Sequence, residues 1–192
     1  GDLAQRMGLM EVKSFVLTDP DLLALFSNPA IQTGNAKSRT YSATRTTLQA
    51  GLLDILSRNI NAPKPINIYE TGEVLRINAS KVIEETCCWG FASLDARASF
   101  TWAKSYVQTL LKALNIDYTL IPCEAQHYIV GRAATVIIDG KAAGQFGEII
   151  TVAASLLVSR TRLRWGVGLW CADVLRFTSG VARISRGLRL MV

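Results

Sequence analysis

The sequence predicts an α+β domain in which an antiparallel sheet is flanked by helices. Two segments, residues 42–59 and 100–114, place apolar residues at helical spacing. The dipeptide Asp139-Gly140 separates two strand-like runs and favours a tight hairpin turn. Because hairpins outnumber long crossover connections, the strands are expected to run antiparallel.

The first forty residues predict short elements. Residues 3–9 resemble the end of a helix, and residues 10–17 alternate in the manner of a strand. The segment Asp19-Pro20-Asp21 predicts a helix start, because proline is favoured in the first turn. Residues 27–39 predict a turn or hairpin, since they contain Asn-Pro and Gly-Asn pairs.

A long amphipathic helix over Ser42–Asn59 is the central prediction. Its apolar face is formed by Leu48, Leu52, Ile55 and Leu56, which we expect to pack on the domain's own sheet. Pro63 and Pro65 forbid its continuation. A strand then starts at Ile66, and Gly72 is expected to bend it or form a bulge.

The second half predicts further strands. Residues 85–93 are typical of a buried central strand, and residues 118–121, 133–138 and 141–149 of shorter ones. Residues 165–171 are expected to supply the last strand of the sheet.

Length and composition indicate a single globular domain. The chain has 192 residues, of which 49% are hydrophobic, and this excludes a disordered protein. No run of eighteen apolar residues occurs, so we expect no membrane span. Residues 1–6 include an acid and do not resemble a signal peptide, and the expected location is the cytoplasm.

The net charge of +6 is concentrated at one end. From Arg160 onward there are seven arginines and one acid, Asp173, whereas the first 159 residues carry 14 bases and 14 acids. The sequence therefore predicts a neutral globule with a basic end.

No metal site is expected. The four cysteines are Cys87, Cys88, Cys123 and Cys171, and their spacing does not match that of metal-binding motifs. His127 is the only histidine. Free thiols in a reducing compartment are the expected state.

Several ordered blocks resemble one known family. They are Gly8-Leu-Met-Glu-Val-Lys-Ser-Phe15, Asn35-Ala-Lys-Ser38, Thr44-Arg-Thr-Thr-Leu-Gln-Ala-Gly-Leu-Leu53, Ile68-Tyr-Glu-Thr-Gly-Glu-Val74, Val130-Gly-Arg-Ala-Ala134 and Gly144-Gln-Phe-Gly-Glu-Ile149. Together they resemble the C-terminal, catalytic-like domain of the β subunit of phenylalanyl-tRNA synthetase. The match covers residues 1–150 well and residues 151–192 weakly, and we treat 1–192 as one domain cut from a longer subunit.

The resemblance implies a class II aminoacyl-tRNA synthetase-like fold without catalysis. In this family the β-subunit domain is a degenerate, structural copy of the catalytic α subunit. The partner would be that α subunit, in an (αβ)₂ enzyme that joins phenylalanine to tRNA(Phe). ATP and magnesium would serve the holoenzyme, and this domain would hold no cofactor.

Two arginine positions bear on catalysis. Active class II enzymes use one arginine after the second-motif strand, and Arg76 lies near that place. A second arginine ends the third motif, where this chain has Trp170 or Cys171. Arg164 or Arg176 are weak substitutes. Arg76 is therefore only a weak nucleotide-binding candidate, and we expect no catalytic residue.

The helix over residues 42–59 also suggests a subunit interface, because the family packs this helix against the α subunit. Gly51 inside a helix indicates close approach of a neighbour. We expect Arg45, Thr47, Gly51 and Asp54 to face another subunit. The alternative is that Gly51 allows close packing within the domain itself.

Other basic residues have weaker functional interpretations. The Arg132 guanidinium suits phosphate, but an ion pair with Glu124 or Glu148 is the simpler expectation. Arg183, Arg186 and Arg189 are candidates for contacts with tRNA phosphates. Two alternative functions stay open: a compact class II ligase using Arg76 and residues 165–171, and a stand-alone RNA-binding module built on the basic end.

Overall fold

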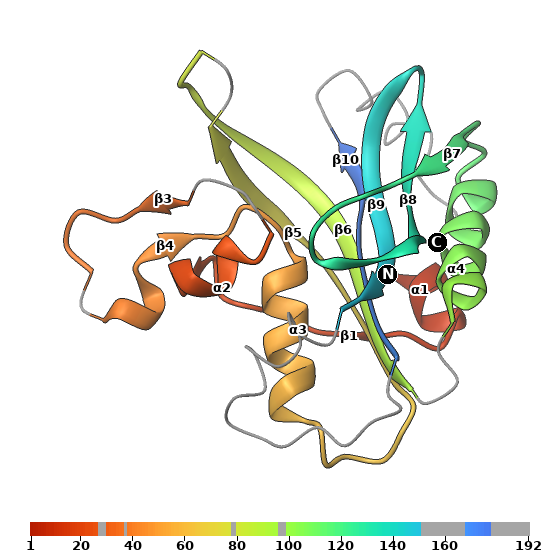
Figure 1. Ribbon diagram of the computed structural model, residues 1–192, viewed down its shortest axis with the longest axis horizontal. Coiled ribbons are helices and arrows are strands. Elements are labelled where there is room, and N and C mark those ends of the chain that lie inside the picture. The colour runs from red at the N-terminus through yellow and green to blue at the C-terminus, as the bar shows by residue number, and fades with distance from the viewer. Residues whose placement is uncertain (27–29, 37, 78–79, 96–98, 151–167, 178–192) are drawn as a thin grey trace.

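A seven-stranded sheet runs through the middle of the molecule (Figure 1). The computed structural model describes residues 1–177 apart from 27–29, 37, 78–79, 96–98 and 151–167, and for β10 only the backbone path. The strands are β1 (Met10–Glu11), β5 (Ile66–Ile77), β6 (Ile83–Asp95), β7 (Thr119–Pro122), β8 (Tyr128–Ile138), β9 (Lys141–Ile149) and β10 (Gly168–Phe177). Their order is β1-β5-β6-β10-β9-β8-β7, and every pair is antiparallel except β1 with β5. The predicted α+β class with a mainly antiparallel sheet is confirmed.

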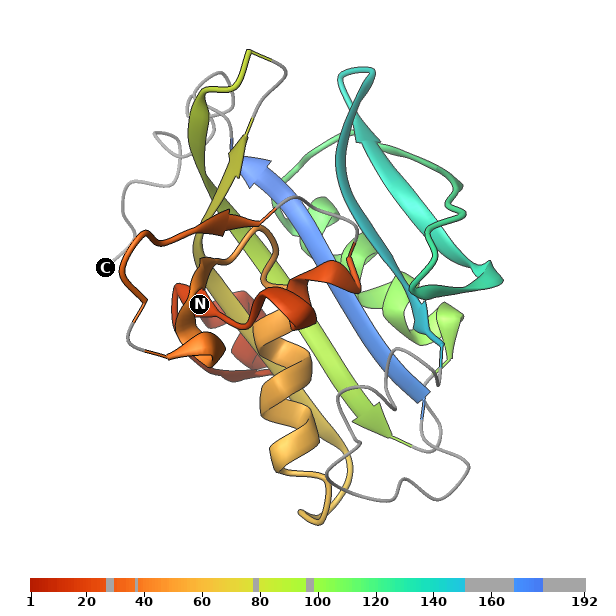
Figure 2. The same cartoon turned by 60° about the vertical axis from the view of Figure 1, so that its left-hand side comes forward.

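Helices cover both faces of this sheet (Figures 1 and 2). The short helix α2 (Pro20–Ala24) and the longer α3 (Gln49–Arg58) lie on one face, and α1 (Asp2–Arg6) and α4 (Phe100–Ala113) lie on the other. Each face therefore has its own apolar core, and the sheet separates the two cores.

The N-terminal segment folds into shorter pieces than its alternation predicts. The expected strand over residues 10–17 is two separate strands, β1 and β2 (Leu17–Thr18), which belong to different sheets. Helix α2 begins as expected, because the Asp19 side chain accepts the backbone N–H of Asp21 at 2.9 Å. A second, three-stranded sheet has the order β2-β4-β3, with β3 at Ile31–Gln32 and β4 at Ala43–Thr44. The 3₁₀ helix η1 (Arg39–Tyr41) connects β3 to β4.

Helix α3 starts seven residues later than the periodicity predicts. Residues 43–45 are committed to other partners: Ala43 and Thr44 pair with β2 and β3, and Arg45 bridges Val16 and Leu75 by backbone hydrogen bonds of 2.8 and 3.0 Å. These tertiary pairings outweigh the local helical pattern. The apolar face is confirmed: Leu48, Leu52 and Leu56 are at most 1% exposed and pack in the core with partly buried Ile55.

The longest hairpin joins β5 to β6. Its register is unbroken from Ile66↔Leu94 to Ile77↔Ile83, so the expected bulge at Gly72 is absent and Gly72 pairs regularly with Cys88. Position 72 of this strand still requires glycine, because the Arg45 guanidinium lies against it.

The remaining elements lie close to their predicted positions. Helix α4 is capped by the Ser99 side chain, which accepts the N–H of Trp102 at 3.3 Å. Asp139 and Gly140 both have positive φ, 50° and 72°, as a primed turn between β8 and β9 requires. Among the described residues, none of the helices combines the length and apolar character that a membrane crossing needs.

Candidate functional site

A buried ion pair joins Arg45, the residue that follows β4, to Glu70 on β5. Arg45 Nη1 lies 2.6 Å from Glu70 Oε1, and the two side chains are 6% and 0% exposed. Arg45 Nε also donates to the carbonyl of Glu73 at 2.7 Å. Two desolvated charges are tolerated only when their hydrogen-bonding groups are satisfied, so the pair depends on its neighbours.

Ser14 completes this network. Its hydroxyl donates to Glu70 Oε2 at 2.6 Å, and its backbone N–H approaches the same oxygen at 3.2 Å. Arg45 Nη1 in turn donates to the hydroxyl and the carbonyl of Ser14, at 2.9 and 3.3 Å. Three segments far apart in the sequence are therefore fixed by one cluster, which we call the Arg45 network: Ser14, Arg45 and Glu70.

Two glycines make room for the Arg45 network. A Cβ at Gly72 would collide with the guanidinium, with Arg45 Cζ at 3.3 Å and Nη2 closer still. A Cβ at Gly51 would lie 2.6 Å from Ser14 Cβ and closer to its hydroxyl. Real side chains essentially never approach that closely, so both positions require glycine for packing inside the domain.

The structure corrects the expected interface on α3. Arg45 and Thr47 are 5% and 2% exposed, and the neighbour that Gly51 admits is Ser14 of the same chain. Thr47 Oγ1 accepts the Gln49 N–H at 3.2 Å at the start of the helix. Asp54 is the exception: it is partly exposed and forms an i,i+4 ion pair of 2.8 Å with Arg58, so its role toward a partner stays a prediction.

Arg76 is held by the fold rather than extended into solvent. It is half-buried in β5, and its Nε donates to the carbonyl of Thr46 at 2.9 Å. Thr46 lies in the connection between β4 and α3, so this bond ties β5 to that connection. The arginine thus has a structural task next to the Arg45 network.

His127 is a buried neutral imidazole. It is 8% exposed, and its ring lies 5.0 Å from that of Phe26 and 4.1 Å from that of Tyr128. Burial lowers the pKa of His127 from 6.5 to about 4. The neighbouring Tyr128 hydroxyl accepts a hydrogen bond of 2.7 Å from Gln49 Nε2, so this loop is tied to α3.

The described part of the chain contains no group of three side chains able to hold a metal ion. Cys87 and Cys88 are adjacent on β6 and therefore point to opposite faces; Cys88 is buried in the core and Cys87 is partly exposed. Burial, together with Glu73, raises the pKa of the Cys87 thiol. Arg132 forms the expected ion pair with Glu148, at 2.9 Å.

Several predicted positions are not described. Arg164, Arg183, Arg186 and Arg189 lie outside the described residues. Trp170, Cys171 and Arg176 belong to β10, whose backbone pairs with β6 but whose side chains are not described.

Sequence reasoning missed Ser14 and Glu70. A usable signal existed for Glu70, because it alternates with Ile68, Gly72 and Val74 on the face of β5 that carries apolar residues. A charge at such a position must find a buried partner. No pattern in the sequence links Ser14 to it, since the two are 56 residues apart.

Comparisons with known proteins agree on the family. The family model "Phenylalanyl tRNA synthetase beta chain CLM domain" matches residues 1–156. A phenylalanine–tRNA ligase β subunit of Thermococcus sibiricus is 32% identical over 155 residues, which are 77% of this chain and 28% of that protein. One of Saccharolobus islandicus is 29% identical over 144 residues, which are 74% of this chain and 26% of that protein. This chain thus spans little more than a quarter of the curated relatives.

A solved structure shares the fold. The pyrrolysyl-tRNA synthetase PylSc of Desulfitobacterium hafniense superposes with a TM-score of 0.67 at 14% identity, covering 90% of this chain and 60% of that one. The match concerns the fold alone, and a class II synthetase-like arrangement agrees with the sheet described above. The family model spans most of the chain, and this chain therefore belongs to the family of the phenylalanyl-tRNA synthetase β-chain CLM domain.

Proposed function

We propose that this domain is a non-catalytic, class II synthetase-like part of a phenylalanine–tRNA ligase β subunit. Its task is to assemble with the catalytic α subunit, in an (αβ)₂ enzyme that charges tRNA(Phe) in the cytoplasm. ATP and magnesium would act at the α subunit, where positive charge stabilises the reacting phosphate. Family membership supports the proposal, as do the three free cysteines of the described chain, which suit a reducing compartment.

The position of Arg76 is the observation that supports the proposed lack of catalytic activity. An arginine that binds a nucleotide must present its guanidinium to the phosphate. Here Arg76 Nε donates to the Thr46 carbonyl at 2.9 Å, and the side chain is half-buried in β5. The neighbouring Arg45 donates to Glu70, Glu73 and Ser14.

Calorimetric titration tests this point. The domain is titrated with ATP and magnesium, and then with phenylalanyl-adenylate, and no heat of binding is expected from either. The purified α subunit serves as a positive control in the same buffer. A micromolar site on this domain would overturn the proposal and favour the compact ligase.

Contact of the basic end with tRNA is a separate part of the proposal. Arg183, Arg186 and Arg189 supply charge but no pattern for reading bases, so any binding would be to phosphates. Affinity for RNA is then expected to fall steeply with salt, and deleting residues 177–192 should remove most of it. RNA binding that survives both changes would contradict this part alone.

A further inference from the structure

The three-stranded sheet β2-β4-β3, which we call the small sheet, buries little apolar surface. Each of its strands is two residues long, and Ala43 is the one buried residue among these six. On the segments next to the strands, Phe15 is 76% exposed and Tyr41 is 41% exposed. Since burial of apolar surface is the main source of stability, the small sheet has little of it to hold it closed.

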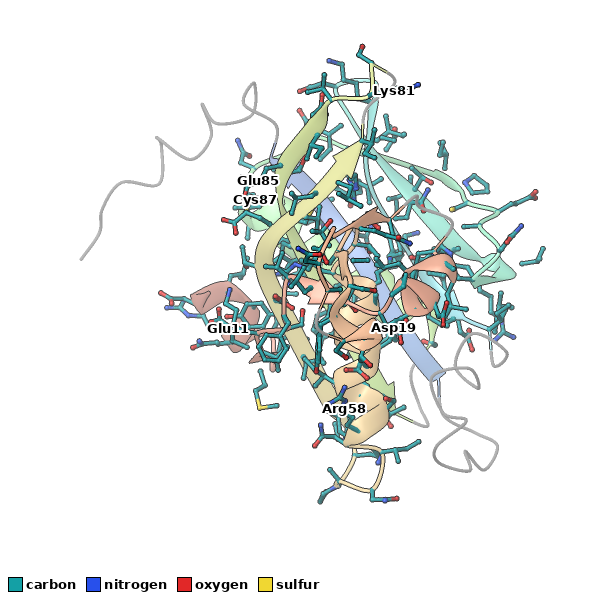
Figure 3. All side chains as sticks on the ribbon, turned by 90° about the vertical axis from the view of Figure 1, so that its left-hand side faces the viewer. Glu11, Asp19, Arg58, Lys81, Glu85 and Cys87 are labelled. Atoms are coloured by element: carbon teal, nitrogen blue, oxygen red, sulfur yellow. The ribbon has the colours of Figure 1, made fainter. Side chains whose placement is uncertain are left out.

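The small sheet also lies apart from the main sheet. Figure 1 shows β3 and β4 extending away from the main sheet, beyond α2. Figure 3 views the molecule from this side and places Asp19 at the start of α2 and Arg58 at the end of α3. Helix α2 lies between β2 and β3 in sequence, yet Leu23 and the following Phe26 are buried in the core with α3. In its packing, α2 therefore belongs to the core and not to the small sheet.

Polar bonds between the small sheet and β5 converge on Arg45, the residue that follows β4. Its Nη1 donates to Glu70 Oε1 at 2.6 Å, and its Nε donates to the Glu73 carbonyl at 2.7 Å. Its own carbonyl accepts the backbone N–H of Leu75 at 3.0 Å, and its N–H donates to the carbonyl of Val16 at 2.8 Å. One residue thus joins β4, the segment before β2, and β5.

Opening this junction as a whole differs from removing one charged partner. When one partner is removed, the other charge stays buried without compensation. When the junction opens, Arg45 and Glu70 regain water together, and the released backbone gains conformational entropy. Because Ala43 is the only residue of the three strands in the buried core, opening leaves both cores nearly intact. It therefore requires less free energy than global unfolding.

We infer that the small sheet opens and closes as one unit, with the Arg45 network as its latch, while the main sheet and its two cores stay folded. The unit comprises residues 13–18 and, among 31–45, those that the structure describes. The network makes opening all-or-none, because a partly opened junction leaves one charge buried without the other. The inference does not depend on the proposed function.

Hydrogen exchange of backbone amides in the native protein, measured at low and rising urea concentrations, tests the unit. The reporters are the N–H groups of Arg45 and Thr33, which bond to the carbonyls of Val16 and Ser42 at 2.8 and 2.9 Å. Both should give the same opening free energy, with a shallower urea dependence than the amides of α4, because opening exposes less surface. Unequal opening free energies, or a urea dependence as steep as that of α4, would overturn the unit.

Val136→Ala separates the unit from the core. Val136 lies on β8, is fully buried, and belongs to the core with α4. Exchange of the α4 amides should become at least tenfold faster, since these amides exchange through global unfolding. Exchange at Arg45 and Thr33 should change less than twofold, because the core stays folded in the open form. Equal acceleration of all these amides would show that the small sheet opens only with the whole domain.

Ser14→Ala tests the latch. It removes the hydroxyl that joins Arg45 to Glu70, and so destabilises the closed form relative to the open and unfolded forms alike. Thr33, which is not part of the Arg45 network, should therefore exchange severalfold faster, and the α4 amides should accelerate by the same factor. Ser105→Ala is the matched control, because it removes an exposed hydroxyl on α4; Thr33 exchange should not change. Unchanged Thr33 exchange in Ser14→Ala would mean that the small sheet opens with the network intact, and the latch role would be wrong.

Discussion

At the scale of single residues, the Arg45 network explains two glycines that lie in regular elements. Gly51 lies inside a helix and Gly72 inside a strand, at a cost of about 0.5–1 kcal/mol each relative to alanine. Both make space for polar side chains of the same chain, those of Ser14 and Arg45. Packing inside the domain therefore accounts for both glycines, and a role of Gly51 toward another subunit stays a prediction.

The packing of Gly51 against Ser14 can be tested by a double-mutant cycle. Gly51→Ala should destabilise the wild-type domain by about 1–2 kcal/mol, because overpacking against a hydrogen-bonded serine outweighs the gain in helix propensity. In a Ser14→Gly background the obstacle is gone, and the same change should stabilise by up to about 1 kcal/mol. Urea unfolding of the four proteins measures both effects. The same sign in both backgrounds would show that Ser14 is not the obstacle.

Breaking the buried ion pair should cost far more than breaking an exposed one. Glu70→Gln keeps the shape but leaves Arg45 buried without its counter-charge, and should destabilise by about 3–5 kcal/mol. The control is Asp54→Asn on α3, whose ion pair with Arg58 is 37% and 64% exposed and should contribute less than about 1 kcal/mol. Equal losses in urea unfolding would mean that the Arg45 network is not a structural centre.

His127 should make stability depend on pH. Its pKa is about 4 in the folded protein and near 6.5 when unfolded, so the unfolded chain binds the proton more readily. Stability is full above pH 6.5 and is lost as the pH falls toward 4. Between pH 7 and 5 the loss from this residue should be about 2 kcal/mol. Comparing wild type with His127→Leu at both pH values isolates the effect; identical pH dependence would contradict it.

At the scale of elements, local signals predicted those segments whose structure depends on local chemistry. The caps at Asp19 and Ser99 and the apolar face of α3 agree with the periodicity and capping rules. The start of α3 could not be predicted, since Arg45 is held extended by backbone bonds to Val16 and Leu75. The Arg45 network was missed for the same reason: its members meet only in the folded chain.

The β8–β9 turn allows a test at this scale. Gly140 has φ 72° with no atom near its missing Cβ, so Gly140→Ala introduces backbone strain without a clash and should cost about 1 kcal/mol. Gly34→Ala is the matched control, because its surroundings are also open but its φ is not positive; no loss is expected. Similar melting temperatures for both variants would rule out the primed turn.

At the scale of the whole molecule, one sheet carries two separate cores, one on each face. Phe91 and Phe146 lie in the core under α4, with Phe100 stacked on Phe146 at 5.4 Å. The other core holds α3 and adjoins the Arg45 network. The shared fold with a pyrrolysyl-tRNA synthetase shows that the scaffold also occurs in a synthetase. In this chain, the Arg45 network holds the fold together.

Sedimentation velocity of the chain mixed with the cognate α subunit tests the central claim, that this is an assembly domain, most directly. We expect the two to move as one heavier species at micromolar concentration, with no need for ATP, phenylalanine or tRNA. Two independent boundaries at the positions of the separate proteins, under the same conditions, would contradict the claim.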